Sequence, residues 1–425
     1  MSFAHFTHKS EPDSLQDMHF KGKTMLRTFS LIVFKNCIYV IILTQIMDNP
    51  LKKLLASFGN IGSNSENSAV GIDIGSSAIK VVEIKRKAGK AVLETYGSIS
   101  LGPYATEDVG RVTNLSVEKI AEALKEVMKQ AEVTTLAAAF SIPVQSSLIF
   151  TIDLPAQIKE TEMSAIVSTE ARRYIPVPIT EVSLDYFILP QKEASFEDMN
   201  KTPSVSSIPE KPTEKTNILV VATQNDAVAR CRSIVSQCGL SSSFFEIEIF
   251  SSIRSNFEHE LSPVLLIDFG ASRTKLSIVE FGMIKNYHTI DRGGADISDA
   301  IAKSLTISFT EAEKMKKEFG LFGSPNEKSL VDIIKVHTDY IFSEANNALL
   351  GYEKKFDRTI SKVIFTGGGA LLKGLIDVAA TNFKAEIELG HPFSKVNSPE
   401  FLQKVLENMG PEFAVALGLA LRKLQ

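Results

Sequence analysis

The sequence has few cysteines, no excess of positive charge and none of the common nucleotide or metalloprotease signatures. Cys37, Cys231 and Cys238 follow no metal-binding spacing and form no even-numbered disulfide framework, as is typical of a protein in a reducing cytoplasm. A net charge of -4 and the absence of a basic stripe give no electrostatic reason to expect nucleic acid as a partner. The P-loop, the dinucleotide-binding fingerprint and the H-E-x-x-H zinc pair are also missing, which excludes those three classes of site.

The N-terminal region contains one strongly apolar run, residues 29–46, which Lys35 interrupts. The run is barely long enough to cross a bilayer, and a lysine near its middle would be costly there. Met47 opens a second sensible beginning. We therefore interpret residues 1–46 as an over-extended gene start or a signal anchor, and favour the first. Residues 47–67 are predicted to be an N-terminal amphipathic segment and a linker.

The remaining chain alternates strands and helices, which predicts an α/β protein with more than one domain. Strands are predicted over 69–84 (a hairpin), 136–142, 149–154, 217–223, 264–268 and 362–366. Helices are predicted over 117–130, 159–174, 226–238, 296–305, 310–318, 329–352 and 411–423. The stretch 191–216 is rich in Ser, Pro, Glu and Lys, and this composition predicts a flexible surface insertion.

Two strand–turn–strand segments, GIDIGSSAIK and LIDFGASRTK, carry the same residues at one constant offset along the chain. The matching residues are Asp73, Gly75, Ser77 and Lys80 in the first segment and Asp268, Gly270, Ser272 and Lys275 in the second. One such hairpin would be interpreted as a plain β-turn. The paired occurrence indicates two related half-folds that each open with the same hairpin.

The residue types in these hairpins suit a nucleotide phosphate. Glycine at Gly75 and Gly270 lets the backbone turn sharply, and successive N–H groups in the turn form a nest for anions. Hydroxyl donors are predicted from Ser76, Ser77 and Ser272. Lys80 can reach the phosphates as a point charge.

The carboxylates at the strand ends, Asp73 and Asp268, are predicted to face each other across a cleft. Magnesium keeps most of its waters, so two such groups can hold a hydrated Mg²⁺ ion through those waters while phosphates take the remaining positions. We therefore predict an ATP and Mg²⁺ site between the two hairpins.

A third glycine-rich segment agrees with this interpretation. In VIFTGGGALLKGL a buried strand is followed by Gly367, Gly368 and Gly369 and then by a helix. Backbone without side chains can approach a nucleotide closely near a helix N-terminus. The alternative is a tight strand-to-helix connection.

Together these segments resemble the superfamily of actin, Hsp70 and the sugar kinases, with two phosphate loops and an adenosine motif. The resemblance implies an actin-like, ribonuclease H-like duplicated fold with two lobes around a nucleotide cleft. In the subset that includes the division protein FtsA, an A-E-x-x-K sequence contacts the adenosine. By this resemblance Glu313 and Lys316 are candidate cofactor-binding residues.

The segment from 147 to 189, with LP before a helix and E-A-R-R-Y-I-P at its close, resembles the PilM family of type IV pilus assembly proteins. That family shares with FtsA a relocated subdomain. The resemblance implies these parts: a first lobe over 68–148, a relocated partner-binding subdomain over 149–243, a return to the first lobe over 244–262, and a second lobe over 263–425 with a helical insertion at 293–360.

Members of this family are cytoplasmic proteins at the inner face of the inner membrane. The resemblance implies an ATP-binding adaptor that binds the cytoplasmic N-terminal tail of PilN, within a complex that includes the motor ATPases. The predicted groove for the tail lies around Ile149–Leu154 and Ala165–Tyr174. The alternatives are an FtsA-like membrane-recruitment protein and a kinase of the superfamily. No catalytic base can be assigned from the sequence, so at most weak ATPase activity is expected.

Overall fold

The computed structural model describes residues 40–44, 68–155, 158–189, 215–258, 260, 262–325 and 327–424. Most of the predicted N-terminal segments, 1–46 and 47–67, and nearly all of the predicted insertion 191–216 lie outside the described residues. Within the apolar run 29–46, the structure describes the strand β1, Val40–Thr44, which pairs antiparallel with β4.

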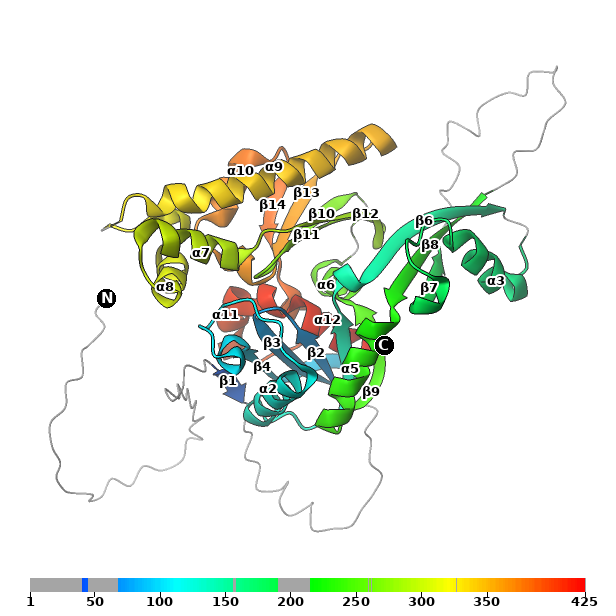
Figure 1. Cartoon of the computed structure of the whole chain (residues 1–425), viewed down its shortest axis with the longest axis horizontal. Coiled ribbons are helices and arrows are strands. Elements are labelled where there is room, and N and C mark those ends of the chain that lie inside the picture. Colours follow the sequence, from blue (N-terminus) through cyan, green and yellow to red (C-terminus); the bar gives the residue numbers. More distant parts are fainter. Residues whose placement is uncertain are drawn as a thin grey trace, which may run out of the picture.

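The first lobe is built on a six-stranded sheet with the order β1-β4-β3-β2-β5-β9 (Figure 1). Its strands after β1 are β2 (Ser68–Ile74), β3 (Ala78–Lys87), β4 (Lys90–Ser100), β5 (Ala137–Ile142) and β9 (Ser241–Ile247). β2 runs antiparallel to β3 and parallel to β5, and β5 runs parallel to β9. Both the hairpin predicted over 69–84 and the strand predicted over 136–142 are therefore present.

The second lobe repeats this arrangement in a five-stranded sheet with the order β12-β11-β10-β13-β14. Its strands are β10 (Val264–Phe269), β11 (Thr274–Glu280), β12 (Met283–Ile290), β13 (Lys362–Thr366) and β14 (Glu386–Leu389). β10 is antiparallel to β11 and parallel to β13, as β2 is to β3 and β5. The register also repeats, because Asp73 lies opposite Lys80 and Asp268 lies opposite Lys275. The duplication indicated by the repeated hairpins is thus present in the sheet topology.

Two helices cover one face of the first sheet. They are α2 (Val117–Gln130) and α5 (Asn225–Cys238), and α2 has the bounds predicted from the sequence. The Ser116 side chain accepts a hydrogen bond from the backbone N–H of Lys119, which caps one of the unpaired donors at the start of α2. Apolar residues at helical spacing on α2 pack with Ile234 and Val235 of α5 in one core. This face is therefore closed by an amphipathic pair of helices.

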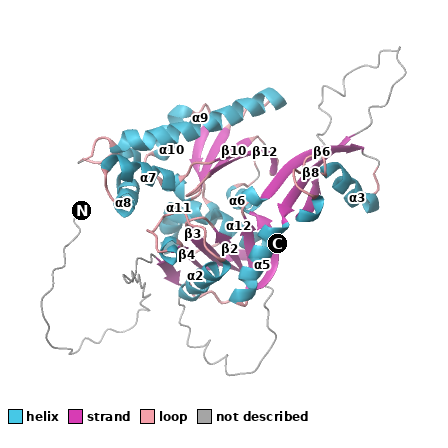
Figure 2. Cartoon of the chain, viewed as in Figure 1, coloured by secondary structure: helices cyan, strands magenta, loops and turns pink. Residues whose placement is uncertain are grey.

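Four helices cover one face of the second sheet. They are α7 (Gly294–Leu305), α8 (Phe309–Phe319), α9 (Leu330–Phe356) and α10 (Leu375–Asn382). Together with the sheet they bury a cluster that includes Phe342, Phe365 and Phe383, whose rings contact edge to face. Figure 2 shows these helices gathered on the outer side of the second sheet. Of these helices, α7, α8 and α9 fall within the predicted helical insertion at 293–360, and α10 lies beyond it.

Between the two sheets lie α6 (Glu248–Asn256) and α12 (Ala414–Leu424), which pack against each other. The contact is close because Gly418 faces the backbone of α6. A Cβ at Gly418 would lie 1.9 Å from the carbonyl oxygen of Ser251, and one at Gly71 would lie 1.8 Å from that of Ala416. Backbone-to-backbone contact at these glycines therefore joins α12 to α6 on one side and to β2 on the other.

A three-stranded antiparallel sheet extends from the first lobe to one side (Figure 1). It consists of β6 (Ser147–Pro155), β8 (Lys215–Gln224) and β7 (Val182–Ile188), with β8 in the centre. The helix α3 (Glu160–Ala171) packs its buried side chains Met163, Val167 and Ala171 against Ile218 and Val220 of β8. We call this sheet and α3 the side subdomain.

Two of the predicted domain boundaries differ from those in the structure. The predicted subdomain 149–243 includes α5, but α5 packs on α2, and β9 joins the first sheet beside β5. The predicted second lobe runs to 425, but its last part, including α11 (Glu400–Met409) and α12, packs on the first sheet around Tyr96. These segments bury apolar faces against the first lobe, a long-range contact that their position in the sequence does not reveal.

Among the described residues, we find no helix that combines the length and the apolar character needed to cross a membrane.

Candidate functional site: a cavity between the two lobes

A cavity of about 910 Å³ lies between the two lobes. The structure brings all of the predicted cofactor-binding residues to its wall. They are Asp73, Gly75, Ser76, Ser77, Lys80, Asp268, Gly270, Ser272, Glu313, Lys316, Gly367, Gly368 and Gly369. This volume and this mixture of backbone turns, hydroxyls and charges suit a small ligand of nucleotide size.

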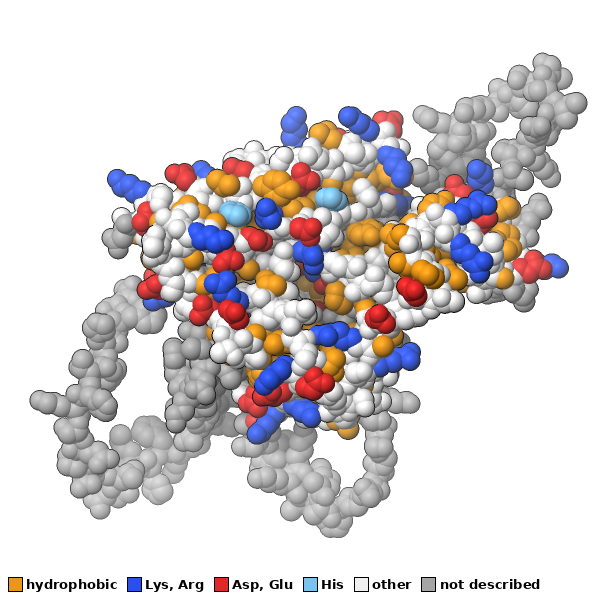
Figure 3. All heavy atoms as spheres, viewed as in Figure 1, with side chains coloured by type: hydrophobic (Ala, Val, Ile, Leu, Met, Phe, Trp, Pro, Cys, Tyr) orange, Lys and Arg blue, Asp and Glu red, His pale blue; other side chains and the backbone are white. Residues whose placement is uncertain are grey.

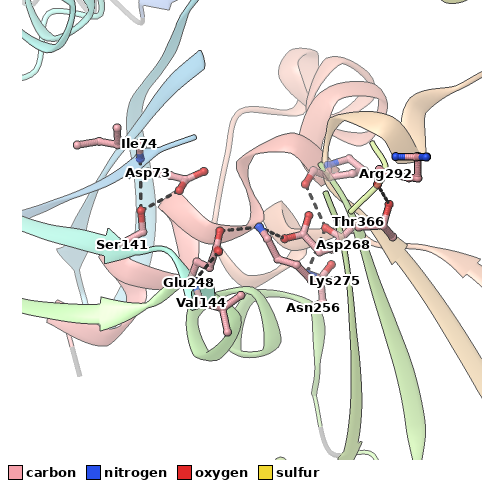
Figure 4. A network of polar contacts seen from close by, with 12 residues as sticks. Asp73, Ile74, Ser141, Val144, Glu248, Asn256, Asp268, Lys275, Arg292 and Thr366 are labelled. Atoms are coloured by element: carbon pink, nitrogen blue, oxygen red, sulfur yellow. Dashed lines mark hydrogen bonds and ion pairs between the residues drawn. The ribbon is translucent and has the colours of Figure 1, made fainter. Parts of the chain in front are cut away.

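The first loop lies at the end of β2, where Asp73 is 8% exposed. Ser141, at the end of the neighbouring strand β5, fixes this carboxylate. Its hydroxyl donates to Asp73 Oδ1 at 2.8 Å and accepts from the backbone N–H of Ile74 at 3.3 Å (Figure 4). Gly75 then closes the turn, because its N–H donates to the carbonyl oxygen of Ala78 at 3.0 Å. These hydrogen bonds fix the shape of the loop.

The second loop has the same turn and a closer backbone neighbour. The N–H of Gly270 donates to the carbonyl oxygen of Arg273 at 2.9 Å, as Gly75 does to Ala78. The start of α7 lies directly against this turn, since a Cβ at Gly293 would lie 2.3 Å from the carbonyl oxygen of Ala271. The N–H of Gly294 donates to the carbonyl oxygen of Gly270 at 2.9 Å. The helix N-terminus and the turn therefore lie together at the cavity, an arrangement that favours anions.

A chain of polar contacts crosses the cavity floor between the lobes (Figure 4). The ammonium of Lys275 lies 2.6 Å from Glu248 Oε2 and 3.3 Å from Asp268 Oδ2. The other oxygen of Glu248 accepts the backbone N–H of Val144 at 2.9 Å. We call this chain, Val144–Glu248–Lys275–Asp268, the floor relay. It connects the segment just before β6 of the side subdomain to the second phosphate loop.

Burial and neighbouring charges both shift the pKa values of Lys275 and Glu248 in the floor relay. Burial disfavours a charged lysine, but the carboxylates of Asp268 and Glu248 outweigh it and raise the pKa of Lys275. Burial raises the pKa of Glu248, and the nearby carboxylates of Asp268 and Asp73 raise it further against the attraction of Lys275. Lys275 is therefore a fixed positive charge in a region of the cavity otherwise lined by carboxylates.

Glu313 and Lys316 are one helical turn apart on α8 and contact each other at 2.6 Å. Lys316 also donates to the carbonyl oxygen of Gly294 at 2.7 Å and to Ser298 Oγ at 2.8 Å. Burial opposes ionisation of Glu313, but the ammonium groups of Lys316 and Lys317 hold its pKa at about 2. Both residues line the cavity, and Lys316 joins α8 to the start of α7 there.

A loop of the first lobe closes the cavity beside α8. Arg111 contacts Asp299 of α7 at 3.0 Å and lies over the ring of Phe309, 4.1 Å from its centroid. Asp108 accepts a hydrogen bond from Thr310 at 2.9 Å. These contacts join the two lobes across one side of the site.

The triple glycine follows β13 and touches the second loop. Gly367 has φ +83°, and a Cβ there would lie 2.5 Å from Asp268 Oδ1 and 2.6 Å from the carbonyl oxygen of Phe269. A Cβ at Gly369 would lie 2.5 Å from the Phe269 ring. The N–H of Gly367 donates to the carbonyl oxygen of Pro411 at 2.9 Å. Glycine is required here because both the conformation and the space exclude a side chain.

The polar residues of the cavity that sequence reasoning missed include Ser141, Glu248 and Glu412. Each is isolated in the sequence, and only the fold brings it to the phosphate loops. Burial raises the pKa of Glu412 against the attraction of Lys80 and Lys317. Glu248 is a carboxylate of the cavity that belongs to neither phosphate loop, and its place in the site could not be assigned from the sequence.

The carboxylates of Asp73 and Asp268 suit a metal ion bound through water molecules better than a metal ion that they ligate directly. Among the described residues no group of three or more His, Cys, Asp or Glu side chains is arranged to ligate a metal. Asp73 and Asp268 each have one oxygen engaged by Ser141 and Lys275, respectively. Two such carboxylates can bind water molecules of a hydrated Mg²⁺, as the sequence predicts, but they form no protein cage.

Comparisons with known proteins agree with this geometry. The family model described as type IV pilus assembly protein PilM matches residues 71–424. The cell division protein FtsA of Staphylococcus epidermidis is 23% identical over 371 residues, which cover 79% of this chain and 77% of that protein. FtsA of Enterococcus faecalis is 22% identical over 362 residues, 76% of this chain and 78% of that protein.

Among solved structures, a PilM-PilN type IV pilus biogenesis complex is similar with a TM-score of 0.68 and 24% identity, over 84% of this chain and 98% of that chain. The predicted actin-like α/β fold, with two lobes around a cleft, is confirmed by this likeness together with the duplicated sheets.

Proposed function

The chain belongs to the family of type IV pilus assembly protein PilM, and we propose that it is a nucleotide-gated adaptor of the pilus machine. It binds ATP in the cavity between the lobes and the cytoplasmic N-terminal tail of PilN on its side subdomain. It acts in the cytoplasm at the inner face of the inner membrane, in a complex that includes the motor ATPases.

The cavity supports ATP as the ligand. The turns at Gly75 and Gly270 line the cavity, where backbone N–H groups after each glycine would donate to phosphates, and Lys80 lines the same wall. Glu313 and Lys316 lie on the side of α8, where the resemblance to FtsA places the adenosine. When Mg²⁺ is bound it supplies positive charge to the phosphates, and Asp73 and Asp268 would hold it through water.

The floor relay carries the proposal that nucleotide and partner are coupled. A phosphate at the second loop would lie close to Asp268 and Lys275, which contact each other. Lys275 also contacts Glu248, and Glu248 accepts a hydrogen bond from the backbone N–H of Val144. β6 of the side subdomain begins three residues later, at Ser147. A ligand can shift an equilibrium only through different affinities for two states, so the proposal requires the floor relay to differ between the ATP-bound and ATP-free states.

The side subdomain offers a surface for the PilN tail. Within the described residues, β6 and β7 are the outer strands of this sheet, and an added segment could pair with their backbone donors and acceptors. Tyr174 is 52% exposed and stacks on Phe150 with ring centroids 4.9 Å apart. Phe187 and Ile188 at the end of β7 are also exposed. Figure 3 shows hydrophobic side chains gathered over this part of the molecule, where an apolar tail residue would find contacts.

Two other functions fit the fold. FtsA relatives match most of the chain, so an FtsA-like protein that recruits division factors to a membrane is the first alternative. A kinase of the superfamily is the second. It requires a base that activates a substrate hydroxyl, and Glu248 is engaged with Lys275 instead.

The test is direct binding of the full chain to three ligands. Fluorescence anisotropy would be measured with a labelled PilN tail peptide, a scrambled peptide and the C-terminal tail of the division protein FtsZ. We expect saturable binding of the PilN tail alone and ATP turnover slower than that of typical kinases. Binding of the FtsZ tail but not the PilN tail would favour the first alternative, and rapid phosphoryl transfer would favour the second.

A further inference from the structure

The long helix α9 has an exposed face that carries large apolar side chains. α9 lies along the outer edge of the second lobe, and its inner face belongs to the core of that lobe (Figure 1). On the outer face Val336 is 69% exposed, Tyr340 is 50% exposed and Leu350 is 52% exposed. A helix that stays in water usually turns charged and polar side chains to this side. The three apolar side chains therefore indicate that something covers this face.

The exposed face has a definite order along the helix. Residues three or four positions apart lie on the same side of a helix. One such row, which we call the α9 row, consists of Asp332, Val336, Tyr340, Ser343, Asn347, Leu350 and Lys354, all of them exposed. The row has an acid at its N-terminal end, a base at its C-terminal end and a serine at its centre. Within the described part of the chain, neither Asp332 nor Lys354 takes part in an ion pair.

The α9 row is complementary to its own reverse. When two copies of α9 lie antiparallel with Ser343 at the centre, Asp332 of each copy lies opposite Lys354 of the other. Val336 likewise lies opposite Leu350. A two-fold interface has this property, because a residue that contacts a second residue of the partner subunit is met there by its own copy in return.

The centre of the α9 row suits close packing of two helices. The distance between packed helices depends on the side chains at the contact, and the short side chain of Ser343 lets the two backbones approach. Beside this centre, Tyr340 of one copy comes near Asn347 of the other, and its hydroxyl can bond to the amide. The polar residues of the row therefore find partners in the same arrangement that covers its apolar residues.

The helix dipole accounts for only part of this pattern. It favours an acid in the first turn and a base in the last, where Asp332 and Lys354 lie. It gives no reason for exposed apolar side chains between them. Antiparallel pairing explains both the charges at the ends and the apolar residues of the row.

We propose that the exposed face of α9 is the interface of a two-fold homodimer of this chain, formed by antiparallel pairing of two α9 helices about Ser343. The inference goes beyond the proposed function and does not depend on it. No residue of α9 lines the cavity between the lobes, so the dimer does not use that site. The dimer carries two side subdomains in one unit, which raises the avidity for any partner that is itself paired.

The experiment is sedimentation velocity of the full chain from low to high micromolar concentration. One helix per subunit makes a small interface, so the wild type should form a weak, reversible dimer in this range. Asp332→Lys places lysine opposite lysine at both ends of the interface, and Lys354→Asp places aspartate opposite aspartate. Each variant should raise the dissociation constant of the dimer about tenfold or more.

The double variant Asp332→Lys/Lys354→Asp is the decisive comparison. It restores opposite charges at both ends with the signs exchanged, so its dissociation constant should return to within about threefold of the wild type. Lys404→Asp makes the same charge change as Lys354→Asp at an exposed position of α11 and should behave as the wild type. Circular dichroism of each variant checks that the helices are kept.

A second measurement probes the centre of the interface. Mild oxidation should link two chains of the Ser343→Cys variant by a disulfide, because the two thiols face each other at the two-fold axis. Ser304→Cys, at an exposed position of α7, is the matched control. Neither this control nor the wild type, with its three natural cysteines, should be linked to the same extent.

Several results would overturn the inference. A wild type that stays monomeric over the whole concentration range would do so. A dimer that both single charge variants leave unchanged, or a double variant as weak as the single ones, would exclude α9 as the interface. Equal linking of Ser343→Cys and Ser304→Cys would exclude it too, even if a charge variant does not fold. None of these results bears on the proposed function, which is tested by binding of ATP and the PilN tail.

Discussion

Gly367→Ala tests most sharply how the triple glycine supports the second phosphate loop. At φ +83° and ψ 166°, Gly367 is in a conformation that residues with a side chain rarely adopt. A Cβ would lie 2.5 Å from Asp268 Oδ1 and 2.6 Å from the carbonyl oxygen of Phe269. Contacts this short require the carboxylate or the strand end to move, so the substitution acts directly on the site.

The expected cost has two parts. Strained backbone at such a position costs about 1–3 kcal/mol, and forcing extra atoms into a packed region costs about 1–3 kcal/mol more. We therefore expect the free energy of unfolding to fall by about 2–6 kcal/mol. Because Asp268 is displaced, the affinity for ATP should fall at least tenfold.

The matched control is Gly351→Ala. Gly351 lies in α9, and no atom outside its own helix lies within 4 Å of the position of its Cβ. Alanine at such a helical position should raise the free energy of unfolding by about 0.5–1 kcal/mol and leave ATP affinity unchanged.

Both variants would be unfolded in urea and followed by far-UV circular dichroism, since the chain contains no tryptophan for fluorescence. ATP affinity would be measured by calorimetry on the folded proteins. Wild-type stability together with wild-type ATP affinity in Gly367→Ala would refute the argument that the triple glycine exists to accommodate Asp268.

Three further predictions concern the site and the packing that supports it. Asp73→Ala should lower ATP affinity at least a hundredfold and leave the circular dichroism spectrum unchanged; normal affinity in calorimetry would remove Asp73 from the site. Glu313 has a pKa of about 2, held down against its burial by the ammonium of Lys316. Its contribution to stability is therefore present above about pH 4.3, the ordinary glutamate pKa, and is lost as the pH falls to about 2. The difference in urea midpoint between wild type and Glu313→Gln should shrink over this range, and a constant difference would contradict the assignment. Gly418→Ala places a Cβ 1.9 Å from the carbonyl oxygen of Ser251 and should destabilise the protein by about 1–3 kcal/mol in urea; no change would show that α6 and α12 can separate freely.

The residues of the cavity differ in how far the sequence could reveal them. The paired hairpins were identifiable because strand, turn and glycine chemistry is local and the same pattern occurs twice. Asp73 and Asp268 could therefore be assigned to one site from spacing alone. Ser141 and Glu248 could not, because single polar residues at strand and helix ends carry no signal until β5 and α6 are placed beside the loops.

The domain boundaries show the same limit. α12 follows the second lobe in the sequence but packs between β2 and α6. That position depends on glycines at crossing points, Gly71 and Gly418, whose partners lie far away in the chain. Apolar periodicity predicts that a helix is buried, but it does not say against which sheet.

Under the proposed function, nucleotide and partner binding are coupled through the floor relay. The measurement is the affinity of the chain for ATP, by calorimetry, with and without a saturating concentration of the PilN tail peptide, on the wild type and on Glu248→Gln. We predict that the tail changes the ATP affinity of the wild type at least fivefold, that ATP changes the tail affinity by the same factor, and that both factors approach one in Glu248→Gln. A wild type that binds both ligands with no effect of either on the other would contradict the account.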